Sequence, residues 1–226
     1  SLVERGKEGD EERAYKILMK GYKDTDNYRF RQSAGDIKMR AARRKLAKLK
    51  KAVDQNPEDD SLQQKYEQGR VKVTETEMQE YEQRAKEQPT DTQIKYELGR
   101  RHFDLGNYDK AIEQFQQAQS APGITVKVLN YLGQSFVKMG WLDEAIESFQ
   151  SGLERIESET SELGMELRYG LMDTLDRKAR EHDDLASAEE AFKIASSIAV
   201  QQINYRDIRE RRSSIQEFVK GLKAAG

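Results

Sequence analysis

Apolar residues recur every three or four positions along most of the chain, which is the spacing of one face of an α-helix. Between positions 39 and 53 the stripe is Met39, Ala42, Leu46, Leu49 and Val53. A second stripe begins with Leu62, Tyr66 and Val73. Near the C-terminus a third joins Tyr205, Ile208, Ile215, Phe218 and Leu222. We therefore expect an all-helical protein with no strand.

One helical pattern occurs twice in tandem. The stretch "ELGRRHFDLGNYDKAIEQFQQA" (97–118) returns 34 residues later as "YLGQSFVKMGWLDEAIESFQSG" (131–152). The copies pair Leu98 with Leu132, Gly99 with Gly133, Gly106 with Gly140, Ala111 with Ala145, and Phe115 with Phe149. Paired small residues allow two helices to approach, and the paired large ones fill the space between them. The second glycine pair predicts a left-handed helix end, so each copy should be a helix–turn–helix hairpin.

Two weaker copies of the second helix flank this pair, at 9–21 and at 183–195. Asp10, Asn107 and Asp184 fall at one repeat position, where the cap of a second helix is expected.

The spacing of equivalent alanines departs from 34 at two places. Ala14 and Ala111 lie 97 residues apart, which is two repeats plus 29 residues, or about eight helical turns. Four extra turns in each helix would make 28–88 one oversized hairpin, with helices from Tyr28 to about Val53 and from about Pro57 to Gln88. This arm should extend about 20 Å past its neighbours and remain unbroken through the β-branched run at 69–76.

The second departure is smaller. Ala145 and Ala188 lie 43 residues apart, so this repeat has nine extra residues, and nine is not a whole number of turns. We expect part of the excess to form a loop at "AREHDDL" (179–185). After it, Asn204 should cap a final helix whose outer face is polar.

The repeated pattern resembles the tetratricopeptide repeat (TPR), a unit of 34 residues whose signature has Leu, Gly, Gly, Ala and Phe at the matched positions. The resemblance implies a right-handed α-α superhelix, or solenoid, with one hairpin extended into an antiparallel arm and a C-terminal capping helix. The divisions it implies are a partial repeat (1–27), the extended hairpin (28–88), two repeats (89–123 and 124–159), a degenerate extended repeat (160–203) and the capping helix (204–226). The layout resembles the C-terminal part of bacterial multi-repeat proteins.

In this family, partners usually bind on the concave face, which the first helix of each repeat lines. The resemblance places eight residues there: Gln93, Tyr96, Arg100, Phe103, Lys127, Asn130, Gln134 and Lys138. Their polar and cationic character suits an extended acidic or mixed peptide.

Composition narrows the chemistry. A net charge of −2 argues against a general polyanion binder, and the absence of cysteine excludes disulfides and cysteine-based zinc sites. His102 should be a core residue and His182 a loop residue, so we expect no metal site, no cofactor and no catalytic activity. With neither a signal segment nor a long apolar run, we expect a cytoplasmic protein without a membrane partner.

Three functions remain open. The first is a non-catalytic scaffold that binds a protein or peptide. The second is the repeat portion of a larger enzyme, such as a protein O-linked N-acetylglucosamine transferase. The third is nucleic-acid binding through the basic helix 38–51, although those cations would more simply pair with acids of their own hairpin.

Two further expectations concern exposed apolar residues. Trp141 should pack between neighbouring hairpins, with exposure as a partner anchor as the alternative. The chain should be a fragment, because residues 1–8 supply only the end of a first helix. The face made by Tyr15, Leu18 and Met19 could then mediate self-association.

Overall fold

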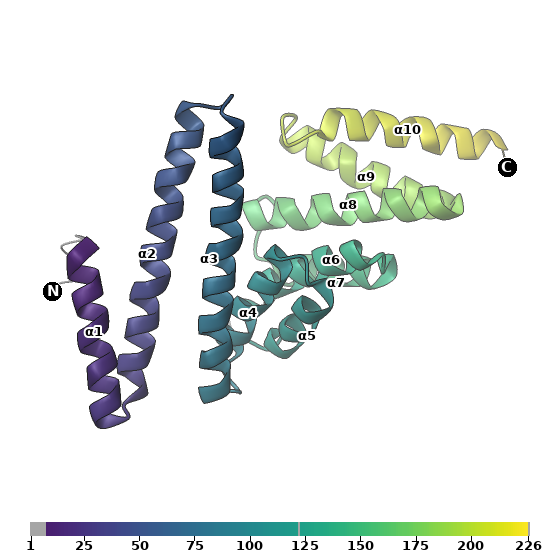
Figure 1. The fold of residues 1–226 in the computed structure, drawn as a ribbon. Coiled ribbons are helices and arrows are strands. Elements are labelled where there is room, and N and C mark those ends of the chain that lie inside the picture. Colours follow the sequence, from purple (N-terminus) through teal and green to yellow (C-terminus); the bar gives the residue numbers. More distant parts are fainter. Residues whose placement is uncertain (1–7, 122, 226) are drawn as a thin grey trace. The chain divides into compact units, whose positions relative to one another are not determined.

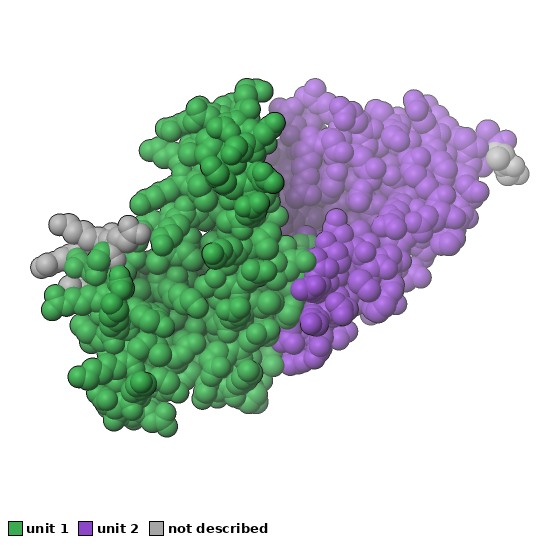
Figure 2. All heavy atoms as spheres, in the orientation of Figure 1, with its two compact units in different colours: residues 1–105 green, residues 106–226 purple. Residues whose placement is uncertain are grey.

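The computed structural model describes residues 8–121 and 123–225, and these residues form helices joined by short turns (Figure 1). The chain divides into two compact units, residues 1–105 and residues 106–226, coloured separately in Figure 2. The division lies inside the predicted repeat 89–123. Residues 1–7, which include most of the predicted partial first helix, lie outside the described range.

Between residues 8 and 105, unit 1 contains four helices, each packed against the next. They are α1 (Glu8–Thr25), α2 (Tyr28–Gln55), α3 (Asp60–Glu87) and α4 (Thr92–Asp104). Because α1 already begins at Glu8, Asp10 lies inside the helix, and the prediction that it caps a helix is wrong.

The two longest helices of unit 1 correspond to those of the predicted extended hairpin. α2 and α3 have 28 residues each, and their bounds fall close to those expected from the eight-turn spacing. α3 begins at Asp60 rather than at Pro57, because the Asp59 carboxylate accepts the Leu62 N–H at 3.0 Å and caps the helix there. It continues without a break through 69–76, where the Thr74 hydroxyl donates to the Arg70 carbonyl at 3.1 Å.

A buried ionic network joins the arm to α4. Glu80 is 4% exposed and accepts hydrogen bonds from Arg31 on α2 at 2.8 and 2.9 Å and from Arg84 at 3.1 Å. Arg84 also donates to Asp36 on α2 at 2.7 Å. Gly35 makes room for this cluster, since a Cβ placed there would lie 2.0 Å from Glu80 Oε1.

A second carboxylate completes the network. Glu77 accepts from Arg43 of α2 and from Arg101 of α4, whose Nε lies 2.9 Å away. The Tyr81 ring lies between the two buried guanidinium groups, 4.8 Å from Arg101 and 5.4 Å from Arg84. The three helices are therefore joined by paired charges where apolar side chains would be usual.

Unit 2 contains α5 (Tyr108–Ala118), α6 (Thr125–Met139), α7 (Leu142–Arg155), α8 (Glu162–His182), α9 (Leu185–Gln201) and α10 (Ile208–Ala225). Each packs against the next, and α6 also contacts α8. Gly140 ends α6 with a φ of 77°, the left-handed end that the repeat predicts.

The interior of unit 2 is apolar and closely fitted. Phe149 of α7 is 1% exposed, and its ring packs directly against the backbone at two glycines. A Cβ at Gly133 of α6 would lie 2.6 Å from its ring, and a Cβ at Gly170 of α8 would lie 2.7 Å from it. The small residue at 133 is therefore needed for close packing, as the pairing of small positions predicted.

The nine extra residues of the third repeat are helical. α7 has 14 residues where α5 has 11, and α8 has 21 where α6 has 15. The prediction of a loop at 179–185 is therefore wrong: α8 continues to His182, and only Asp183 and Asp184 separate it from α9. Asp184 caps α9 as predicted, by accepting the Ala186 N–H at 3.0 Å.

The final helix begins three residues later than a cap at Asn204 predicts. α10 starts at Ile208, so Asn204 is not its cap; the Asn204 side chain instead accepts a hydrogen bond from Arg209 at 2.6 Å. Ile208 and Ile215 are fully buried, as the predicted stripe requires.

Candidate partner-binding surfaces

Four of the predicted groove residues lie on α4, in unit 1. Gln93 is exposed, Arg100 and Phe103 are half-buried, and Tyr96 is only 6% exposed. The Arg100 guanidinium lies 5.7 Å from the centre of the Tyr96 ring and 3.5 Å from Glu97. Tyr96 therefore supports Arg100 but has little surface left for a partner.

The other four lie on α6, in unit 2. Lys127 and Lys138 are exposed and Gln134 is half-buried, whereas Asn130 is only 3% exposed. Gln134 and Lys138 line a hollow of about 340 Å³ between α6 and α8. Asn130 lies beside it, since its amide nitrogen donates at 3.0 Å to Glu166, which also lines the hollow.

The far wall of this hollow comes from α8 and from the turn before α10. Its polar side chains are Glu166, Tyr169, Asp173, Thr174 and Arg206. The Arg206 guanidinium lies 4.7 Å from the Tyr169 ring and 5.3 Å from the Tyr205 ring. Arg206 has a φ of 46°, a left-handed conformation uncommon for a residue with a side chain. The Arg206 guanidinium therefore lies against two aromatic rings.

Tyr169 is fixed by a hydrogen bond. Its hydroxyl donates to Asp207, and burial together with this bond raises the pKa of the phenol to about 12. Tyr169 is therefore neutral at physiological pH and serves as an oriented aromatic surface.

The predicted groove residues include none from α8, because the third repeat departs from the repeat signature. Adding the 43-residue offset between Ala145 and Ala188 to the groove position Asn130 gives Asp173. That offset would have found this wall residue. No repeat position indicates Arg206, which lies in the turn between α9 and α10.

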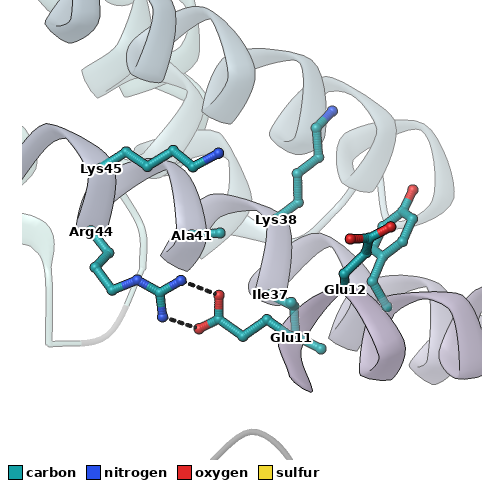
Figure 3. Close-up of a pocket in the computed structure, with 8 residues that line it drawn as sticks. Glu11, Glu12, Ile37, Lys38, Ala41, Arg44 and Lys45 are labelled. Atoms are coloured by element: carbon teal, nitrogen blue, oxygen red, sulfur yellow. Dashed lines mark hydrogen bonds and ion pairs between the residues drawn. The ribbon is translucent and has the colours of Figure 1, made fainter. Parts of the chain in front are cut away.

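A second hollow, of about 460 Å³, lies in unit 1 between α1 and α2 (Figure 3). Ile37 and Ala41 form its apolar part, and Lys38 and Lys45 extend along one side. Arg44 donates to both oxygens of Glu11 at 2.7 Å. As Arg43 also pairs with Glu77, both arginines at the centre of the basic helix 38–51 are engaged with carboxylates of their own unit.

The two histidines of the sequence differ in their burial. His102 is 7% exposed, as expected of a core histidine, and His182 is exposed but ends α8 and does not lie in a loop. Within 8–121 and 123–225, no cluster of histidine, aspartate and glutamate has the geometry to hold a metal ion. None of the described helices is long and apolar enough to span a bilayer.

The comparison with family models decides the repeat type. The Tetratricopeptide repeat model matches residues 92–122 and 126–158, which fall within the two predicted repeats 89–123 and 124–159. The chain contains two tetratricopeptide repeats. A search of curated proteins finds no match.

Solved TPR structures share the helical-repeat fold. YrrB, described as a TPR protein with an unusual peptide-binding site, aligns over 76% of this chain and 84% of its own, at 17% identity and a TM-score of 0.55. MamA aligns over 79% and 95% of the two chains, at 18% identity and a TM-score of 0.50. The TPR fold supports a role in binding proteins or peptides.

Proposed function

We propose that this protein is a non-catalytic scaffold that binds an acidic or mixed extended peptide in the hollow between α6 and α8. The observation that carries the proposal is the lining of that hollow, where Lys138 and Arg206 supply cations and Tyr169 supplies an aromatic wall. The acids of the hollow are already engaged, since Glu166 binds Asn130 and Asp173 binds Arg211. The Asn130 amide is neutral, so Glu166 keeps its charge, whereas Arg211 compensates Asp173. Two cations and one anion therefore face a ligand, which suits an acidic or mixed peptide.

An unused acceptor supports a peptide in particular. Asn130 Oδ1 is buried and has no hydrogen-bond partner among the described residues. A buried acceptor without a partner is costly. Asn130 borders the hollow without lining it, so a peptide backbone N–H would satisfy this oxygen only after the side chain turns toward the hollow. The name of YrrB, as a protein with a peptide-binding site, fits this proposal.

The experiment places a photo-crosslinking residue at Gln134, identifies the captured peptide by mass spectrometry, and measures its affinity by calorimetry. Lys138→Glu together with Arg206→Glu should weaken binding at least tenfold, because two attractive charges become repulsive. The matched control, Lys193→Glu with Lys220→Glu, reverses two exposed cations on α9 and α10 that do not line the hollow.

Two results would contradict the proposal. One is equal affinity in the hollow variant and in its control. The other is a preference for basic peptides over acidic ones. Circular dichroism should show the same helix content in all variants.

A further inference from the structure

Trp141 is the single tryptophan of the chain and is 48% exposed, so the prediction that it packs between hairpins is wrong. Its ring stacks on Phe136, with centroids 5.8 Å apart, and this contact holds it at the surface. Met139, two residues earlier, is also 39% exposed. A large aromatic residue held in this way can serve as an anchor for a partner.

The position of Trp141 conflicts with local helix chemistry. It is the residue before α7, where a short polar side chain would cap the helix, yet it forms no side-chain cap bond. At the equivalent positions, Asp184 before α9 forms such a bond, whereas Asn107 before α5, also predicted as a cap, does not. Forgoing this cap costs about 1 kcal/mol, and local inconsistencies of this kind are concentrated at functional sites.

A small polar cavity of about 200 Å³ lies beside the tryptophan. Acidic side chains dominate it: Asp143 and Glu144 from the first turn of α7 and Glu181 from the end of α8. Lys178 and His182 are the basic residues of its lining, and Lys178 is bound to Asp143 at 2.6 Å. The hydrogen bond to Asp143 raises the pKa of Lys178, so this pair stays ionised. Glu181 is paired with Arg177 of the same helix at 2.9 Å, so Glu144 supplies the excess negative charge of the cavity.

We propose that Trp141 and this cavity form a second docking site that takes an arginine or lysine side chain from a basic segment of a partner protein. The site lies outside the hollow between α6 and α8 and selects the opposite charge. Its occupancy does not depend on the peptide site proposed above.

Size and charge both favour a cationic side chain. Pockets for small-molecule ligands usually enclose 300–1,000 Å³, whereas this cavity has about 200 Å³, which suits one side chain. A tryptophan face attracts cations more strongly than any other aromatic ring. α8 ends at His182 beside the cavity, where the negative end of its helix dipole attracts a cation, while the positive end of the α7 dipole at the same cavity opposes it.

The test uses the fluorescence of Trp141, which reports on this site without a label. A short arginine-rich peptide free of aromatic residues is titrated into the protein, alongside counterparts in which glutamate or glutamine replaces every arginine. The arginine peptide should change the emission saturably, and the change should weaken as salt rises. The other two should cause no saturable change.

Two charge-matched variants separate local from general attraction. Glu144→Gln with Glu181→Gln removes two carboxylates at the cavity and should weaken binding of the arginine peptide about tenfold. Glu190→Gln with Glu217→Gln removes two exposed carboxylates on α9 and α10 and should leave the affinity unchanged. Trp141→Phe, followed by calorimetry, should also weaken binding.

The proposal is overturned if both double variants bind the arginine peptide equally. It is also overturned if the glutamate or glutamine peptide gives the same signal, or if no peptide gives a saturable one. Circular dichroism of each variant confirms that the fold is retained.

Discussion

The two units contain similar numbers of residues but have different interiors. Among the described residues, unit 2 buries 25 apolar side chains and unit 1 buries seven. Unit 1 instead buries five charged residues, against two in unit 2. Burying ions costs much of what their pairing returns, so the interior of unit 1 depends on every partner being present. Helical hairpins can therefore be joined by close apolar packing or by a satisfied ionic network.

The largest effect should come from removing the aromatic centre of unit 2. Phe149→Ala should lower the free energy of unfolding by about 3–5 kcal/mol, since it empties the space between Gly133 and Gly170. Urea unfolding gives the total, and hydrogen exchange should show faster exchange in α6, α7 and α8. A loss below about 1 kcal/mol would mean that apolar packing contributes less to unit 2 than proposed.

The corresponding change in unit 1 removes a charge and keeps the shape. Glu80→Gln should cost about 2–3 kcal/mol, because Arg31 and Arg84 lose their shared carboxylate while Arg84 keeps Asp36. Glu82→Gln, on an exposed position of the same helix, is the control and should cost almost nothing. Faster hydrogen exchange in α2 and α3 should accompany only the first variant. Equal stability of the two would show that the network is not what joins these helices.

Two glycine-to-alanine substitutions, one in each unit, extend the comparison with smaller expected effects on stability. Gly35→Ala places a methyl group against the Glu80 carboxylate and should destabilise unit 1 by about 1–2 kcal/mol. Gly221→Ala on α10 meets no atom within 4 Å and should stabilise the protein by about 0.5–1 kcal/mol, because alanine favours helix. Thermal unfolding should therefore move in opposite directions, and a shift of the same sign in both would contradict the close approach at Gly35.

The smallest effect concerns the polar surface of unit 2. Tyr169 should titrate with a pKa of about 12, raised by burial and by its bond to Asp207. The folded state then holds the proton more tightly than the unfolded chain, whose pKa is about 10. The contribution to stability is full below pH 10 and is lost as pH rises through 12. Absorbance near 295 nm, compared with Tyr169→Phe, measures this pKa, and Asp207→Asn should lower it. An unshifted phenol would show that Tyr169 is not held as described.

The sequence predicts the helices well wherever the repeat signature or whole-turn arithmetic applies. The bounds of α2 and α3 follow from the spacing of Ala14 and Ala111, because helical periodicity constrains how extra residues can be accommodated. Helix starts were predicted less well. Pro57 and Asn204 suit the beginning of a helix, but Asp59 forms the cap of α3 and Asn204 binds a side chain instead.

The ionic network could not be found from apolar periodicity. The stripe of Leu62, Tyr66 and Val73 continues along α3 with the same spacing of three and four, but its next members are Glu77, Glu80 and Arg84. Charged residues ordinarily mark a solvated face, so the apolar pattern of α3 ends just before its most deeply buried residues. Their burial depends on cations from α2 and α4, which single-helix patterns do not reveal. The wall of the hollow could not be predicted for a similar reason: Arg206 comes from a turn that lies outside any repeat.

The length of the arm is separable from its ends. α2 and α3 have the same number of residues, and the four-residue connection between them is closed by the Asp59 cap, which involves α3 alone. Seven residues span almost two helical turns and about 10 Å of rise, so matched insertions of seven in both helices would return each stripe to nearly the same face. The connection at one end of the hairpin and the contacts at the other end would then stay the same while the helices between them become longer. The length of the hairpin could therefore be changed in steps, by engineering or by evolution, without a new turn or a new interface.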